Sequence, residues 1–382
     1  MHRGNNKHNQ WGTGLIFNWK GQLSGKDATF STGMTYSKDL DDPRKDYYIP
    51  WGFGRARQSG PAYNATFSLE NPGVLSEFTY QIFQPLNIRL GARYDWLNGK
   101  YKDHLTEKSS DVRYKFFSPK AGIVYSPLDN LDFYANYGRG FSMPGNFDDG
   151  QDGFFNPHNG LKLSKRDQFE FGIKYRPLEW LSLETTLYHL KTHNDTILDY
   201  STWQSTLAGT TTRQGIEFSF LAKPLQDLSF SGHYAYMENK FDDFKIDGVD
   251  FSGYRLPFAP RQITNLEIAY APKLGFGGRI SYRWEKDMLY TDNPRTKMDG
   301  TPYLIGGGQA KPFKAPDKTF LDLQLNYTFN ETYKLLFDVK NVIGKSYEGY
   351  AYGKDYVTGD YLVNYLDGRA FYLTFIANWD VK

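Results

Sequence analysis

A short stretch near the start of the chain concentrates side chains that could bind a planar, negatively charged ligand. Residues 46–57 read DYYIPWGFGRAR and contain four aromatic residues and two arginines. Guanidinium groups pair with carboxylates and catecholates through parallel hydrogen bonds, and aromatic faces pack against planar groups. The alternative is an aromatic belt at a membrane interface, with the arginines on lipid phosphates. We predict a ligand-binding loop that uses five of these residues: Tyr47, Tyr48, Trp51, Arg55 and Arg57.

The histidines and serines give a weaker basis for metal or catalytic chemistry. His189 and His193 lie four residues apart, and Asp195 follows them. On a strand, four residues span about 13 Å, whereas zinc bonds its ligands at about 2 Å, so the two rings could not share one ion. No serine occupies a G-x-S-x-G sequence, and the chain has no cysteine. We therefore predict no metal site, no bound cofactor and no catalytic residues, so the chain is not expected to be an enzyme.

The composition indicates strands that are apolar on one face and hydrated on the other. Of 382 residues, 30 are Tyr and 29 are Phe, yet the mean hydropathy is −0.62. A soluble core of this size would normally use more Leu, Ile and Val. The net charge of +2 gives no reason to expect nucleic acid as a partner. No run of about 18 apolar residues is present, which argues against a transmembrane helix.

Turn signals recur at a regular interval and divide the chain into hairpins. Two turns without proline are expected at 21–25 and 330–332. The others contain proline, and a period of their size indicates a structural repeat. These prolines lie 42 to 50 residues apart: Pro85, Pro127, Pro177, Pro224 and Pro272.

The segments beside these turns alternate strictly between apolar and polar residues, as 86–96 and 321–329 illustrate. Such runs exceed the soluble strand of about 5–6 residues and match the ~9–11 residues that cross a bilayer at a tilt. A soluble β-propeller also repeats at about 40–50 residues, but it packs four short strands into each period. Short turns at one end and long loops at the other are typical of transmembrane β-barrels. We expect long loops over 38–73, 98–111, 143–164, 191–210, 239–257, 287–316 and 341–368.

Two strands for each of seven turns and one more at 369–379 predict about fifteen strands. An odd number cannot close as a purely antiparallel meander, so either one strand escapes this reading or the chain is a piece of something larger. We expect an all-β, antiparallel up-and-down transmembrane β-barrel, and for a piece of a larger barrel we predict that 11–19 and 371–379 form no regular ladder with each other. A self-contained porin-type channel of about 14–16 strands would show a paired seam and an even count. The polar face should form a hydrated, salt-bridged wall from Arg89, Arg93, Asp95, Lys120, Glu170, Lys174, Glu184, Glu217, Glu267, Arg279, Arg283, Glu285, Asp322 and Asp338.

Five segments carry a resemblance to a known family. They read FSPKAGIVYSPLDNLDFYANYGRGFSMPG, FNPHNGLKLSKRDQFEFGIKYRP, RQGIEFSF, YRLPFAPRQITNLEIAY and FDVKNVIGKSYEGY. In content and order they resemble the barrel of TonB-dependent outer-membrane receptors, from about residue 72 onward. The resemblance implies a barrel of twenty-two strands with a plug domain inside. It also implies that 1–382 is a single β-barrel region of about fifteen strands, truncated at the N-terminus, without the plug and about the first seven strands.

The resemblance further implies a function and its partners. Such a receptor of the bacterial outer membrane takes up a metal chelate, and we expect a ferric siderophore. TonB would act only through the absent N-terminal region, and the surroundings would be outer-membrane lipid and lipopolysaccharide. The alternatives are the porin-type channel and, second, the soluble β-propeller. Haem receptors of the family carry a loop histidine between boxes that align with 141–144 and 156–159. His158 falls inside the second box and 145–155 contains no histidine, which argues against haem.

Overall fold

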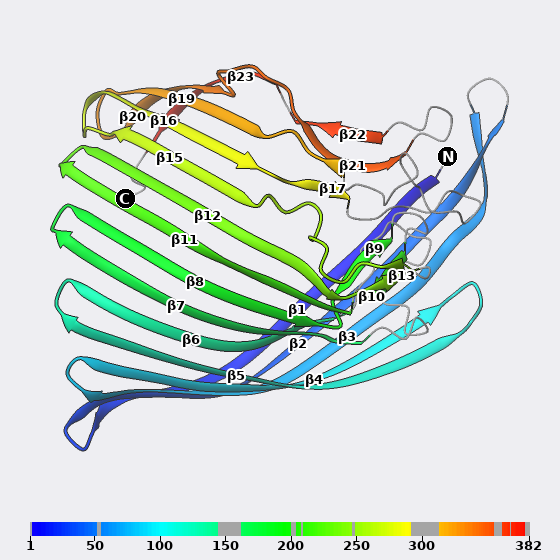
Figure 1. Cartoon of the computed structure of the whole chain (residues 1–382). Helices are drawn as coiled ribbons and strands as arrows, with labels where there is room; N and C mark the ends of the chain where they lie inside the picture. The colour runs from blue at the N-terminus through cyan, green and yellow to red at the C-terminus, as the bar shows by residue number, and fades with distance from the viewer. Residues whose placement is uncertain are drawn as a thin grey trace. The chain divides into compact units, whose positions relative to one another are not determined.

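The alternating segments form β-strands throughout the computed structural model (Figure 1). It contains no α-helix among the described residues, and no helix there is long and apolar enough to cross a membrane. The structure describes 2–51, 55–143, 162–199, 204–207, 209–246, 249–291, 313–354, 361–366 and 368–378.

Fifteen strands of the described residues form one sheet in which every strand follows its predecessor in chain order. The strand number confirms the prediction, and it is odd. β1 and β23 are the first and last strands of this order. The fifteen are β1 (His2–Leu23), β2 (Lys26–Trp51), β3 (Arg55–Phe83), β4 (Leu86–Asp103), β5 (Ser109–Leu128), β6 (Leu131–Ser142), β7 (Ser164–Leu178), β8 (Leu181–His193), β11 (Thr210–Leu225), β12 (Leu228–Asp243), β15 (Gln262–Tyr270), β16 (Gly275–Lys286), β19 (Lys318–Thr328), β20 (Tyr333–Lys340) and β23 (Ala370–Ala377).

Eight shorter strands form four separate two-stranded ribbons within the connections. They are β9 (Thr196–Asp199) with β10 (Gln204–Leu207), β13 (Lys245–Ile246) with β14 (Val249–Asp250), β17 (Leu289–Thr291) with β18 (Phe313–Lys314), and β21 (Glu348–Lys354) with β22 (Tyr361–Tyr365).

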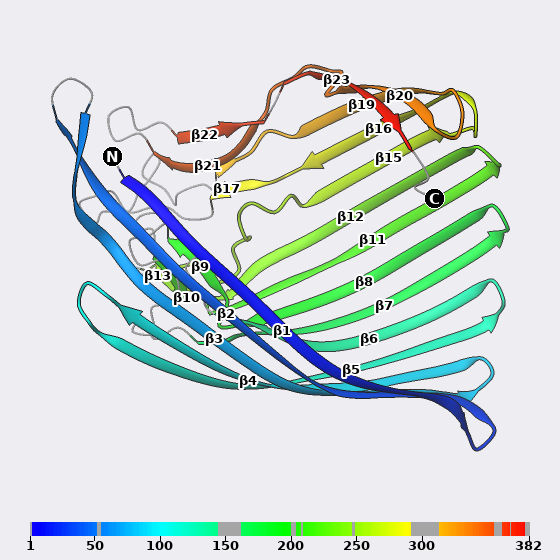
Figure 2. The ribbon, with the colours of Figure 1, turned by 180° about the vertical axis from the view of Figure 1, so that it is seen from behind.

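Contacts between residues divide the chain into two compact units. Within unit 1, β1 to β5 lie side by side in chain order in both views (Figures 1 and 2). Unit 1 comprises Met1–Tyr125, Ala135–Phe169 and Lys191–Thr210, and unit 2 comprises Ser126–Tyr134, Glu170–Leu190 and Thr211–Lys382.

The short turns form where the sequence predicts them, with one adjustment. Ser24 and Gly25 both have positive φ, 52° and 73°, the conformation that a two-residue hairpin turn requires and that glycine adopts without strain. Asn330 Oδ1 accepts the N–H groups of Thr332 and Tyr333 at 2.9 and 2.8 Å and so closes the β19–β20 turn. The adjustment concerns prolines such as Pro127, which lies inside the end of β5 because the turn itself is the following Asp129–Asn130 pair.

Several predicted long loops are largely strand, and those predictions were wrong in extent. β2 and β3 pair from Ala28↔Tyr80 to Trp51↔Arg55, which converts most of the predicted loop 38–73 into a hairpin. Register shifts between Lys45 and Asp46 and between Tyr47 and Tyr48 interrupt this ladder. The polar residues of this segment are compatible with strand because their backbone groups are satisfied by the partner strand.

Apolar residues line up across neighbouring strands on one face of unit 1. The register places Leu15 opposite Met34, Met34 opposite Val74, Val74 opposite Tyr94 and Tyr94 opposite Phe117. Leu15, Met34 and Phe117 are 72, 61 and 51% exposed. Such a column of exposed apolar side chains is expected of a surface that contacts lipid.

Candidate functional site

The five predicted ligand-binding residues lie at the tip of the β2–β3 hairpin. β2 ends at Trp51 and β3 begins at Arg55, so most of the predicted ligand-binding loop is paired strand. The backbone pairing brings all five positions into adjoining rungs of one ladder. Their side chains lie outside the part of the chain whose side chains the structure describes. The residue pairs of this ladder include Tyr47 with Gly60, Tyr48 with Gln58, Ile49 with Arg57, and Trp51 with Arg55.

Most of the charged residues predicted for the polar face are paired with opposite charges. Glu77 on β3 bonds both Lys120 and Arg89, the latter at 3.5 Å. The predicted salt-bridged wall is therefore confirmed for these described residues. Further pairs are Lys174–Glu184 at 3.6 Å, Arg279–Glu267 at 3.7 Å, Arg283–Glu285 at 2.5 Å and Lys340–Asp322 at 3.1 Å.

Arg93 and Asp95 form the most enclosed of these pairs in unit 1. Asp95 is 1% exposed and accepts hydrogen bonds from Arg93 Nε at 2.9 Å and Nη2 at 2.7 Å. Arg93 Nη2 also donates to Thr35 Oγ1 at 2.9 Å. Two charges on one strand, two residues apart, thereby fix each other's orientation, and the pair ties β4 to β2.

The connection between β12 and β15 folds around its own aromatic core. Phe241, Phe244 and Phe251 are each at most 2% exposed, with ring centroids 4.8 and 5.4 Å apart in that order. Tyr254 adds an edge contact to Phe251 at 6.0 Å. Backbone bonds from Phe241 N to Tyr254 O and from Phe251 N to Phe244 O close the loop on this cluster. The described residues of the predicted polar loop 239–257 thus pack around a buried aromatic cluster.

Asp287, just beyond β16, links three segments of unit 2. Its carboxylate lies 3.0 Å from Arg255 Nη1, 3.3 Å from Lys314 Nζ and 3.8 Å from Arg261 Nη1. Arg255 Nη2 also donates to the Asp287 carbonyl at 2.5 Å, and Asp287 itself has a φ of 60°. Partial burial alone would raise the pKa of Asp287. The charge of Arg255 and hydrogen bonds from Arg255 and Lys314 outweigh burial, so this pKa lies below its ordinary value.

The histidines considered for metal binding contact different residues. His189 Nδ1 lies 3.2 Å from Gln214 Oε1, and His193 Nδ1 lies 3.5 Å from Thr210 Oγ1. No group of three metal-ligating side chains occurs in the described segments. His158 lies outside the described residues.

Sequence reasoning missed both the aromatic core of the β12–β15 connection and the linkage at Asp287. The aromatic core could have been found from the sequence, because a polar loop would not be expected to contain four aromatic residues so close together: Phe241, Phe244, Phe251 and Tyr254. The linkage at Asp287 left no such signal, since the residues around Asp287 come from connections far apart in the sequence.

The chain belongs to the family described as TonB dependent receptor-like, beta-barrel, whose pattern it matches over residues 2–342. The predicted family and the all-β barrel class are thereby confirmed.

Curated relatives are receptors of greater length. The chain is 23% identical over 269 residues to the metal-pseudopaline receptor CntO of Pseudomonas aeruginosa, covering 68% of this chain and 33% of that receptor. It is 25% identical over 244 residues to the probable TonB-dependent receptor BfrD of Bordetella pertussis, covering 63% of this chain and 31% of that protein. The match therefore spans about a third of each relative's length.

Solved structures share the fold at low sequence identity. The siderophore receptor PiuA from Acinetobacter baumannii superposes with a TM-score of 0.77 at 16% identity, over 98% of this chain and 56% of that one. The ferric citrate transporter FecA superposes with a TM-score of 0.74 at 17% identity, over 98% and 55%. The chain thus corresponds in fold to about half of such a receptor.

Proposed function

We propose that this chain forms the larger part of the barrel wall of an outer-membrane receptor that imports a metal chelate. The observation that carries the proposal is the family match over residues 2–342. Receptors of this kind draw energy from TonB, which would act through a part of the receptor outside this chain. We propose that 1–382 is a single β-barrel region of a larger barrel.

A ferric siderophore is the ligand that we propose. PiuA is named as a siderophore receptor and FecA as a ferric citrate transporter, while CntO is named as a receptor for metal-pseudopaline. All three names denote a metal held by an organic chelator. Arginine and aromatic side chains suit such anionic, partly planar complexes, since the metal arrives already coordinated.

The tip of the β2–β3 hairpin is the ligand-contacting segment that we propose. Tyr47, Tyr48, Trp51, Arg55 and Arg57 adjoin one another along its ladder, as the register of the two strands requires.

A self-contained porin-type channel is less consistent with the strand order. The described residues contribute fifteen strands to the main sheet, whereas single-chain bacterial barrels are even-numbered.

Fractionation and ligand binding test this function. The chain, produced in a Gram-negative host behind a secretory leader, should be recovered in the outer-membrane fraction. The purified protein in detergent should show tryptophan quenching by ferric catecholate, ferric citrate or another ferric chelate, and weaker quenching by the iron-free chelator. Recovery only in the soluble fraction would contradict the membrane assignment. Equal response to ferric and iron-free forms across the panel would contradict the chelate assignment.

A further inference from the structure

The half of the β4–β5 hairpin that lies nearer the connection between the two strands has one buried face and one exposed face. Asp95 and Leu97 on β4 are each 1% exposed, and Phe116 on β5 is 4% exposed. Leu97 and Phe116 pack with Leu163 in a small core. Because side chains alternate along a strand, the residues between them point away from that core.

Four cations occupy this exposed face and define what we call the cationic patch: Lys100, Lys102, Arg113 and Lys115. The register sets Lys115 opposite Trp96, Arg113 opposite Asn98, Lys100 opposite Asp111 and Lys102 opposite Ser109, so the four lie on two adjacent strands. All four are exposed.

Carboxylates neutralise the cationic patch only in part. Lys102 pairs with Glu107 at 3.0 Å, and Asp111 stands opposite Lys100. Glu70, across the neighbouring strand, already bonds Lys38 at 2.9 Å. Arg113 and Lys115 have no ion pair within the part of the chain that the structure describes. The patch therefore carries an excess of positive charge on an exposed sheet face.

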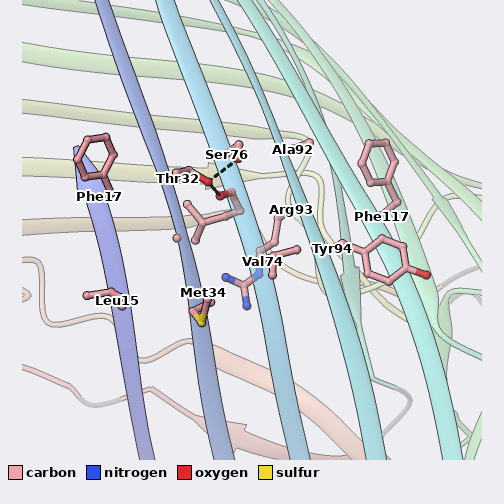
Figure 3. A pocket seen from close by; sticks show the side chains of 12 residues that line it. Leu15, Phe17, Thr32, Met34, Val74, Ser76, Ala92, Arg93, Tyr94 and Phe117 are labelled. Carbon is pink, nitrogen blue, oxygen red and sulfur yellow. Dashed lines mark hydrogen bonds between the residues drawn. The ribbon is translucent and has the colours of Figure 1, made fainter. Parts of the chain in front are cut away.

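An apolar groove lies on the same face, next to the patch. Figure 3 shows Leu15 and Phe17 on one side of this groove and Tyr94 and Phe117 on the other. Its volume is about 490 Å³. Between these walls lie Met34 and Val74 and, as the floor, the shorter side chains of Thr32, Ser76 and Ala92 from β2, β3 and β4.

The groove offers little to a polar ligand, because the guanidinium group of Arg93, its charged lining residue, is engaged by Asp95. Thr32 Oγ1 donates to the Leu75 carbonyl at 3.0 Å and lies 2.8 Å from Ser76 Oγ (Figure 3). The two hydroxyl groups thus satisfy each other and the backbone. A groove with bulky apolar walls and a self-satisfied floor suits a hydrocarbon chain.

Aromatic side chains lie between the groove and the cationic patch. Tyr94 and Phe117 wall the groove, and Trp96 and Lys115 occupy the next positions on the same face, about 7 Å further along the strands. The Tyr94 and Trp96 rings contact each other at 4.7 Å. Tyrosine and tryptophan between apolar and charged surface are typical of the level where lipid tails meet headgroups.

We propose that this face of β1–β5 holds one phosphorylated lipid, with an acyl chain in the groove and the headgroup phosphate on the cationic patch. The inference rests on the proposed membrane location. Arg113 can bind a phosphate through two parallel hydrogen bonds, and the lysines act as point charges. The adjoining groove specifies a lipid rather than free phosphate, since inorganic phosphate would use the patch alone.

Lipid retention by the full chain tests this site. The protein is incorporated into phosphatidylcholine vesicles that contain either lipid A or dephosphorylated lipid A, re-extracted in detergent, and its bound lipid is measured by native mass spectrometry. The full chain should retain lipid A, and inorganic phosphate should not displace it. The variant K100Q/K102Q/R113Q/K115Q should retain at least about tenfold less lipid A than the unmodified chain, because each basic residue near an anionic lipid adds several-fold to binding. Ala92→Phe, which fills the groove floor, should also lower retention.

A matched control removes four positive charges beside short turns: K20Q/K26Q/K223Q/K273Q. Its retention should equal that of the unmodified chain. Equal retention by the patch variant, equal retention of dephosphorylated lipid A, or full displacement by inorganic phosphate would each overturn the lipid site. Far-ultraviolet circular dichroism confirms that each variant keeps its sheet. Failure to enter any vesicle would contradict the membrane location as well, whereas equal entry without selective retention contradicts the lipid site alone.

Discussion

Gly73 on β3 lies against the guanidinium group of Arg93 on β4. A Cβ atom at position 73 would lie 2.5 Å from Arg93 Nη2 and 2.9 Å from Asp95 Oδ1. The absence of a side chain at this position therefore makes room for the enclosed Arg93–Asp95 pair.

Gly73→Ala should destabilise the sheet through this contact. The added methyl group must displace Arg93 or Asp95, and overpacking of this kind costs about 1–3 kcal/mol. Urea unfolding in detergent, followed by circular dichroism, measures the change. Gly138→Ala is the control, since no heavy atom lies within 4 Å of its Cβ position and its stability should change little. Equal effects of the two substitutions would contradict the packing argument.

Arg93→Met should lower the free energy of unfolding by more than the same substitution at a more exposed ion pair. It leaves the carboxylate of Asp95 enclosed without a counter-charge, at a cost of about 2–3 kcal/mol after allowance for the partial exposure of Arg93. Arg139→Met removes a pair with Asp167 in which the arginine is 41% exposed. That change should cost at most about 1 kcal/mol. The urea unfolding midpoints of the two variants are compared, and a smaller loss of stability for Arg93→Met than for Arg139→Met would refute the prediction.

The linkage at Asp287 should weaken in acid. Because the folded-state pKa of Asp287 is lowered, its contribution is fully present above the ordinary value of 3.8 and is lost as the pH falls through the lowered pKa. Asp287→Asn removes the charge and keeps a residue that tolerates positive φ. The stability difference between the chain and this variant should be large at neutral pH and shrink below about pH 4. A difference that stays constant across this range would contradict the charge-based account.

Phe251→Ala should loosen the β12–β15 connection. Truncation of a fully buried Phe removes about 3–5 kcal/mol of local packing. Limited proteolysis should then cut within 243–262 much faster than in the unmodified chain. Phe276→Ala serves as the control, because Phe276 is 78% exposed and lies on a strand beside a short turn. Unchanged protection of 243–262 would show that the aromatic cluster does not hold the connection.

The arginines at the β2–β3 tip should contribute to chelate binding. Loss of charge-assisted hydrogen bonds worth about 1.5–3 kcal/mol each predicts that R55Q/R57Q weakens binding of a ferric chelate by at least about tenfold. K100Q/R113Q removes the same charge from the same unit and should leave this affinity unchanged. Tryptophan quenching by the chelate measures both. Equal affinities of the two variants would remove the tip from the site.

The strands and short turns were predictable because their signals are local. The alternation in 86–96 marks β4, and Asn330 marks its turn, without reference to any distant residue. The extension of β2 beyond Lys38 was not predictable in this way. Its polar sequence becomes strand only because a matching segment of β3 lies beside it.

The site was predictable only in part for a similar reason. Arginines and aromatics within 46–57 stand out from composition alone, and their role in ligand binding stays a prediction. Their position at the end of a long β2–β3 hairpin was not predicted. The linkage at Asp287 depends on Arg255 and Lys314, which the path of the connections brings together. No sequence pattern predicts that these residues contact each other. Glutamate and lysine partners on the polar face were easier, because strand neighbours at fixed register must share a face.

In the proposed membrane location, the length of the β2–β3 hairpin would place its tip far from the hydrocarbon layer. β2 has 26 residues, and strands rise about 3.3 Å per residue, so β2 is roughly 85 Å long. A strand of about 9–11 residues already crosses the hydrocarbon layer. If β2 crosses from its turn with β1, more than half of it stands in the aqueous layer outside. A ligand bound at Arg55 and Arg57 would then be held at the tip of the hairpin, tens of ångströms from the lipid, before it reached the barrel itself.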